Sequence, residues 1–295
     1  MHLRPHDFLL RLALCQGLSC QSKYRLWKAS EESYDFDHPI AMADRAGLSA
    51  KAHDALAANW PSKELDADVA ANKHVSFISL VDPEYPLLLK ESACPPIGFW
   101  YRGNPAILRR PSLSVVGARQ MSSYSASVLR GLLPPVIKSG IVIVSGLARG
   151  VDGLSHELTL RSLGATVAVV GCGLDRCYPK EHQHLMTEII KTGIVISEYP
   201  MGSAPVPWHF PERNRIIAGL SDTLLVTEAR QKSGSLITAN LALNDNRNVC
   251  AIPGRIDAPL SVGTNSLIAE GAVPITCARD LLEQFPTNKF AVDDE

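Results

Sequence analysis

The chain has 295 residues, of which 46% are hydrophobic and 20% charged, and this balance excludes a mainly disordered, collagen-like or coiled-coil protein. Twenty-nine lysines and arginines against 30 aspartates and glutamates give a net charge of −1, so any nucleic-acid site must be a local basic patch. The seven cysteines contain no CxxC pair, and no apolar run approaches the length needed to span a bilayer. The sequence therefore predicts a cytoplasmic protein with free thiols and, most simply, two domains.

Residues 1–65 are predicted to form a small helical domain. The turn at 16–19 places a single glycine between two helices. The domain could therefore be a helix-hairpin-helix that presents backbone amides to phosphate, or a helical interaction module that touches no DNA. Helical periodicity covers residues 8–14, 22–28 and, with a break at Gly47, 39–60.

Residues 66–111 are rich in proline around one strand pattern, 75–80, which is typical of a connector packed on the next domain. From residue 112 onward, apolar runs that end in glycine or polar turns alternate with helical patterns. This alternation predicts a doubly wound parallel α/β sheet over 112–287, followed by a C-terminal tail, 288–295. Strands are expected at 113–116, 141–144, 166–170, 194–196, 223–226 and 248–252, and helices at 125–138, 154–162, 181–191 and 236–245.

Ligands of a doubly wound sheet bind beyond the carboxyl ends of its strands, so the turns there must build the site. None of these turns has a complete GxGxxG, which disfavours a dinucleotide cofactor. Arg119 follows the first strand, where its guanidinium and the amides of the next helix could grip a phosphate, although it could equally pair with a nearby carboxylate. The second turn, 145–152, places small residues such as Gly146 where backbone must approach another group closely, and it carries Arg149.

Histidines and carboxylates form no convincing catalytic or metal site in this sequence. Asp152 and His156 lie one helical turn apart and could do acid–base work, but such pairs are more often structural. His182 and His184 alternate on a predicted helix, which separates their rings, and no cysteine lies at zinc-ligand spacing from them. No nucleophilic triad, GxSxG or GK[ST] motif is present. The sequence therefore predicts no catalytic residue and no metal, and it favours binding over bond-making.

The densest functional signal is a group of cations near the ends of two later strands. Ser233, Gly234 and Ser235 would add amides and hydroxyls at the start of a helix, forming an anion cradle. Aromatic residues lie among these cations, which suits single-stranded nucleic acid because phosphates take the charges while bases stack on the rings. In the alternative interpretation Trp208 and Phe210 belong to the core. The cations are Arg213, Arg215, Arg230 and Lys232, with Lys180 beside Tyr178 after the third strand.

Six motifs in order resemble those of the DprA/Smf family of bacterial DNA-processing proteins. They are VVGAR at 115–119, SGLARGVD at 145–152, YPK at 178–180, HFPERNRIIAG at 209–219, SGSLITA at 233–239 and AIPG at 251–254. The resemblance implies an extended Rossmann-like fold and a cytoplasmic homodimer without catalytic activity or cofactor. It further implies that the protein binds single-stranded DNA taken up during natural transformation and loads the recombinase RecA onto it.

Two positions, Arg119 and Lys180, match the family's basic DNA pocket. The loop 199–208 has no lysine or arginine, so we expect a weaker pocket on that side. The chain ends ten residues after Phe285, and we expect no winged-helix domain of the kind many relatives append. The charge and turn arguments extend the DNA-binding candidates to Arg213, Arg215, Arg230, Lys232, Gly146, Arg149, Ser233, Gly234 and Ser235.

A late helical stretch, 262–271, is the expected place of self-association. Leu267 and Ile268 are adjacent, about 100° apart around a helix, so one can pack inward while the other faces out. The resemblance implies dimerisation through this part of the chain, although both side chains could instead belong to the core.

Two other functions compete with single-strand binding. One is a nucleotide-processing hydrolase of the lysine-decarboxylase-like group, which would use Glu228 as its acid. That group needs a Pro-Gly-Gly-x-Gly-Thr turn, and the sequence after Glu228 does not supply it. The other is a purely structural RecA partner whose pocket holds nothing.

Overall fold

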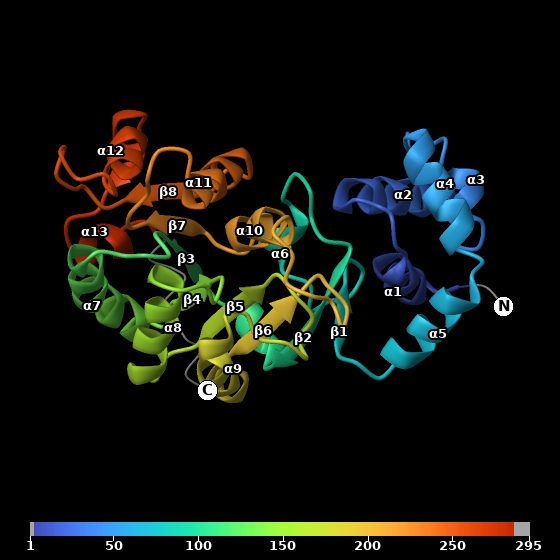
Figure 1. Ribbon diagram of the computed structural model, residues 1–295, viewed down its shortest axis with the longest axis horizontal. Coiled ribbons are helices and arrows are strands. Elements are labelled where there is room, and N and C mark those ends of the chain that lie inside the picture. Colours follow the sequence, from blue (N-terminus) through green and yellow to red (C-terminus); the bar gives the residue numbers. More distant parts are fainter. Residues whose placement is uncertain (1–2, 286–295) are drawn as a thin grey trace.

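The computed structural model describes residues 3–285 and contains two parts, a helical module and an α/β body (Figure 1). The predicted tail at 288–295 lies outside the described residues. Within residues 3–285 no helix is both long and apolar enough to cross a membrane.

Five helices build the helical module. Serine side chains at 19, 49 and 62 accept hydrogen bonds from backbone N–H groups three residues later and so cap three of these helices. A cluster of rings around Phe8, including Trp27 and Trp60, fills the core. The last helix crosses the boundary expected at residue 65; it buries only one apolar side chain, Leu65, which explains its weak periodicity. The helices are α1 (Pro5–Leu14), α2 (Cys20–Ser33), α3 (Pro39–Met42), α4 (Ala50–Asn59) and α5 (Lys63–Asn72).

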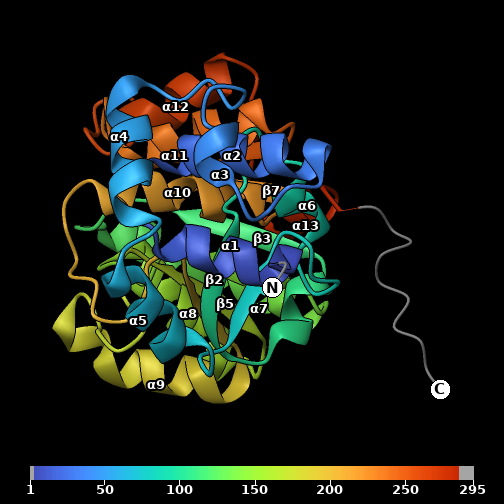
Figure 2. The same cartoon turned by 90° about the vertical axis from the view of Figure 1, so that its right-hand side faces the viewer.

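The predicted connector contributes strands to the sheet. β1 (Phe77–Ser79) pairs antiparallel with β2 (Gly98–Gly103), and β2 pairs antiparallel with β6 (Ile194–Ser197). The short helices α6 (Leu87–Lys90) and η1 (Pro105–Arg109) lie in the same segment. The helix α1 packs against β1 and β2, so the helical module covers this antiparallel edge (Figure 2).

The rest of the sheet is parallel, as predicted, and the doubly wound fold is confirmed. The strand order is β1-β2-β6-β5-β4-β3-β7-β8-β9. The chain starts this sheet at β3, adds three strands on one side, and then returns to add three on the other, so the winding reverses between β3 and β7. The remaining strands are β3 (Ser112–Val116), β4 (Val142–Ser145), β5 (Thr166–Val170), β7 (Thr223–Val226), β8 (Asn248–Ala251) and β9 (Val273–Pro274).

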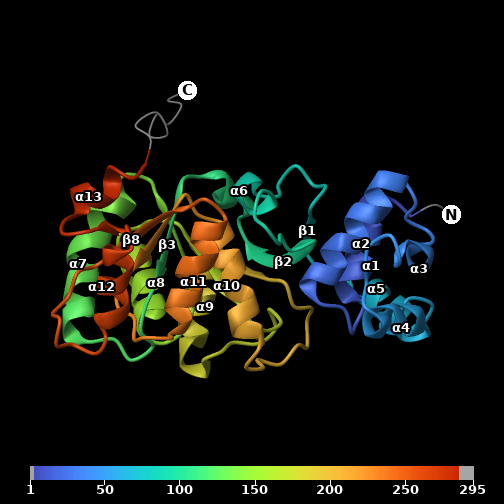
Figure 3. The same ribbon diagram turned by 90° about the horizontal axis from the view of Figure 1, so that it is seen from above.

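Helices cover both faces of the parallel sheet. Along β4, Ile143 belongs to one hydrophobic cluster while Val142 and Val144 belong to the other, as expected for a strand buried on both sides. One cluster includes residues of α7, α8 and α13, and the other includes residues of α10 and α11, which lie side by side in Figure 3. The helices are α7 (Ser123–Lys138), α8 (Val151–Arg161), η2 (Lys180–His182), α9 (Gln183–Thr192), α10 (His209–Gly219), α11 (Gly234–Asn244), α12 (Val262–Ala269) and α13 (Ala278–Leu282).

Candidate functional site

A cavity of about 630 Å³ opens at the carboxyl ends of β3, β4 and β7, where the winding of the sheet reverses. This is the place where doubly wound sheets bind ligands. The cavity is lined by the loops 116–120, 148–152 and 228–230 together with the first turns of α10 and α11.

Arg119 stands at the rim of this cavity together with two aromatic rings. It is exposed, its guanidinium lies 5.5 Å from the centre of the Phe210 ring, and no carboxylate within residues 3–285 pairs with it. The Phe210 ring is in turn 5.3 Å from the Tyr178 ring, and both line a smaller cavity beside the first. Phe210 is half-buried and Trp208 is 64% exposed, so neither ring is a core residue. The rim therefore combines a free cation with aromatic surfaces.

The start of α11 also lines the cavity, with Ser233, Gly234 and Ser235, where the sequence predicts an anion cradle. The Ser233 hydroxyl caps the helix by accepting a hydrogen bond from the Leu236 N–H, and a side chain at Gly234 would meet only open space. The Ser235 hydroxyl donates to the Gly117 carbonyl at 3.0 Å, which ties this wall to the loop after β3. The partial positive charge of the helix N-terminus thus faces the cavity.

Arg213 lines the cavity floor but is 3% exposed and held by the protein itself. Its Nη1 donates to the Val169 carbonyl at 2.8 Å, and its guanidinium lies on Gly146, where a Cβ would come within 1.6 Å of Nη1. Asp152 is buried close by; burial raises the pKa of this carboxyl, and the Arg213 charge opposes that shift. Gly146 therefore makes room for Arg213, where the sequence suggested room for a ligand.

Arg215 does not join the predicted group of cations, and this part of the prediction is wrong. Residues 209–219 form the helix α10, which the sequence analysis did not predict. Two residues along a helix turn the side chain by about 200°, so Arg215 faces away from the cavity that Arg213 lines. Its Nη2 pairs with the Glu198 carboxylate at 2.5 Å, and both side chains are largely buried.

The other predicted cations are exposed around the cavity. Arg230 and Arg149 line it, and Arg149 also pairs with Glu181. Lys180 follows Tyr178 at the smaller cavity, and Lys232 lies in the loop that leads into α11; neither lysine lines the main cavity.

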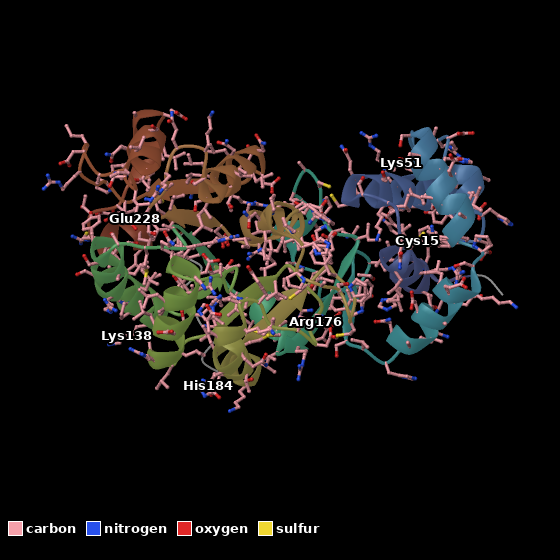
Figure 4. All side chains as sticks on the ribbon, in the orientation of Figure 1. Cys15, Lys51, Lys138, Arg176, His184 and Glu228 are labelled. Carbon is pink, nitrogen blue, oxygen red and sulfur yellow. The ribbon has the colours of Figure 1, made fainter. Side chains whose placement is uncertain are left out.

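The candidate acid–base groups are engaged in the fold. His156 is fully buried with Nδ1 2.7 Å from the Thr166 hydroxyl, and burial lowers the pKa of this histidine to about 3. It is therefore neutral near pH 7 and is a structural residue. His182 contacts the Leu147 carbonyl through Nδ1, whereas His184 points outward from α9 (Figure 4).

Glu228 also lies at the cavity, at the carboxyl end of β7 (Figure 4). Its carboxylate accepts hydrogen bonds from both the N–H and the hydroxyl of Ser122, the residue that caps α7. Both carboxylate oxygens of Glu228 accept hydrogen bonds from Ser122, so Glu228 links the start of α7 to the end of β7.

Comparison with known proteins agrees with this architecture. The family model for DNA recombination-mediator protein A matches residues 76–286. The DNA processing protein DprA of Streptococcus pneumoniae is 38% identical over 263 residues, which cover 88% of this chain and 93% of that protein. This chain belongs to the DprA/Smf family. The Bacillus subtilis DprA is also 38% identical, over 72% of each chain.

Two solved DprA structures share the fold. The S. pneumoniae structure superposes with a TM-score of 0.88 at 34% identity and covers 97% of this chain and 99% of its own. The Helicobacter pylori DprA, whose structure addresses a single-stranded DNA binding mode, has a TM-score of 0.65 at 30% identity and covers 72% of this chain and 99% of its own. The fit to the S. pneumoniae protein includes the helical module as well as the α/β body.

The contact between Gly146 and Arg213 leads to a stability prediction for this DprA/Smf protein. Gly146→Ala should lower the free energy of unfolding by about 3 kcal/mol or more, because the new methyl group displaces Arg213 and leaves a buried charge without its partners. Gly131→Ala is the matched control: Gly131 is exposed within α7 with nothing within 4 Å of its Cβ position, so the change should stabilise the protein by up to about 1 kcal/mol. Urea unfolding measures both, and equal midpoints for the two variants would contradict the assignment.

Proposed function

We propose that this protein binds single-stranded DNA along the rim of the main cavity. Phosphates would contact Arg119, Arg230 and the start of α11, while unstacked bases lie on the rings of Tyr178 and Phe210. Backbone phosphates and exposed base faces are common to every sequence, so binding should be sequence-tolerant.

The observation that carries the proposal is the exposed Arg119 guanidinium over the Phe210 ring, in a cavity that the N-terminus of α11 also lines. A cation beside a ring, with a second anion-binding group in the same cavity, fits a phosphate and its neighbouring base together. The H. pylori relative supports the proposal, because its structure concerns single-stranded DNA binding.

Beyond binding, the family resemblance supports a wider role. On this proposal the protein acts in the cytoplasm as a homodimer, protects single strands taken up during natural transformation and loads RecA onto them. It holds its DNA without breaking bonds and without a cofactor.

Fluorescence anisotropy with a labelled oligo-dT tests the proposal. The oligonucleotide should bind, and free thymidine monophosphate should compete only at far higher concentration, because a mononucleotide offers one phosphate and one base. Equally effective competition by the mononucleotide would favour the nucleotide hydrolase, in which Glu228 would have to leave Ser122. No binding at low salt would favour a purely structural role.

Salt dependence gives a separate prediction. If Arg119, Arg230 and Lys180 each neutralise one phosphate, the logarithm of the affinity should fall with the logarithm of salt concentration with a slope of about −2. Anisotropy titrations at several potassium chloride concentrations measure this slope. A flat response would contradict phosphate contacts at the cavity.

A further inference from the structure

Two cysteines meet where the helical module contacts the α/β body. Cys20 is the first residue of α2, and Cys94 lies in the loop between α6 and β2. The Cys94 thiol donates a hydrogen bond to the Cys20 sulfur at 3.7 Å, and both residues are partly exposed. The pair therefore joins two segments 74 residues apart in the chain and is open to small solutes.

The surroundings of Cys20 favour its thiolate form. The hydrogen bond from Cys94 lowers the pKa of Cys20 to about 6; burial opposes this shift, the Arg215 charge supports it, and the Glu198 charge opposes it. Cys20 also lies at the N-terminus of a 14-residue helix, where partial positive charge stabilises an anion. The same hydrogen bond raises the pKa of Cys94, which stays a thiol.

Arg215 is the second observation that points to an anionic sulfur at this place. It is nine-tenths buried, and its Nε and Nη1 have no hydrogen-bond partner at ordinary distance within residues 3–285. The Nη2 atom of Arg215 donates a hydrogen bond to the Glu198 carboxylate. The Nε and Nη1 atoms of Arg215 are therefore available to the Cys20 thiolate. A buried arginine with unused donors beside a sulfur is the environment of a reactive cysteine.

We propose that Cys20 and Cys94 are a peroxide-responsive pair that closes a disulfide between the helical module and the α/β body. The Cys20 thiolate attacks hydrogen peroxide, the O–O bond breaks, and Cys20 sulfenic acid forms as hydroxide leaves. The Cys94 sulfur then attacks the Cys20 sulfur; its proton and the sulfenic hydroxyl leave as water, and the S–S bond forms. A dithiol reductant reverses the reaction.

The disulfide would clamp α2 to the loop that feeds β2. The two sulfurs need to approach from 3.7 Å to about 2 Å, a shift that must come from the partly exposed Cys94 and its neighbours, because residues 95–97 are buried. The clamp lies against Arg215, on the side of α10 opposite the cavity residue Arg213, so it leaves the proposed DNA contacts in place. Oxidation would therefore fix the position of the helical module and leave DNA binding intact.

Mass spectrometry of the full chain tests this inference without DNA, so its failure is separate from a failure of the proposed function. The protein is treated with hydrogen peroxide at pH 7, quenched with iodoacetamide and digested without reductant. We expect the Cys20 and Cys94 peptides to be joined, with a mass two hydrogen atoms below their sum, and to separate after dithiothreitol. The oxidised protein should also unfold at higher urea concentration than the reduced protein.

Two variants keep the test decisive. Cys94→Ala should stop the reaction at a Cys20 sulfenic acid that dimedone traps, and it should shift the pH profile of Cys20 alkylation upward because the hydrogen-bond donor is lost. Cys277→Ser, which removes an exposed cysteine far along the chain, should leave the cross-link unchanged. Free Cys20 and Cys94 in a sample whose Cys277 is already oxidised would overturn the proposal. It would also be overturned if the Cys20 peptide of the Cys94→Ala protein became joined to a different cysteine peptide, because Cys94 would then not be the specific partner.

Discussion

Replacing Arg119 with alanine should weaken the binding of oligo-dT by about tenfold or more while leaving the fold intact. The lost charge-assisted phosphate contact corresponds to about 1–3 kcal/mol. Arg119 is exposed, and its recorded contact is with the Phe210 ring, so its removal leaves no buried group unpaired. Anisotropy gives the affinity, and urea unfolding checks that stability is unchanged.

Two further alanine variants calibrate this prediction. Arg161→Ala removes an equally exposed arginine at the end of α8, paired with Glu157 and away from the cavity, and it should leave binding unchanged. Lys180→Ala should give a smaller loss than Arg119→Ala because Lys180 lies outside both cavities. If the Arg119→Ala protein folds and binds oligo-dT like the parent, the loop after β3 is not part of the DNA-binding site.

The sheet and the place of the site could be predicted because both depend on local patterns. Short apolar strands such as 166–170 are buried on both faces, and the turns that follow parallel strands must meet at one edge of the sheet. These patterns predict that Arg119, Arg230 and the residues at the start of α11 lie together, and the structure brings all three to one cavity.

The hydrophobic pattern did not predict the helix α10, in which charged side chains are buried. In α10 the buried positions include Arg213 and Arg215, so the hydrophobic periodicity that reveals a helix is broken. Without the helix, the two arginines could not be assigned to opposite sides. The sequence predicts that residue 146 must be small. It does not predict the reason, which is that the Arg213 guanidinium packs against Gly146, because these two residues are 67 positions apart in the chain.

The second prediction with a large effect is that the protein self-associates through the exposed face of α12. Leu267 is buried, and Ile268 is half-buried and packs against the same hydrophobic cluster, so only part of the Ile268 side chain is on the surface and its place in an interface stays a prediction. The exposed positions Val262, Ser266 and Ala269 follow one another at helical spacing, and the helix carries no charged side chain. An uncharged helix face on the outside of a sheet domain can meet its own copy across a two-fold axis.

Ile268 borders this uncharged face next to Ala269, and Ile268→Glu should convert the proposed dimer into a folded monomer if the interface extends over its exposed part. Two like charges without partners would enter a contact that excludes water, at a cost of about 3–5 kcal/mol, which weakens association at least about a hundredfold. Single-strand binding should weaken as well, because a dimer holds one strand with two pockets at high effective concentration. Light scattering measures the mass, and anisotropy the affinity.

Leu163→Glu is the matched control for Ile268→Glu, since it introduces the same charge at a side chain that is 96% exposed in the turn after α8. It should remain dimeric and bind DNA like the parent. If Ile268→Glu also remains dimeric, the interface lies elsewhere on the molecule. If it unfolds at much lower urea concentration than Leu163→Glu, then Ile268 contributes to the core of the monomer, because a half-buried side chain can tolerate a carboxylate only when its remaining surface faces water.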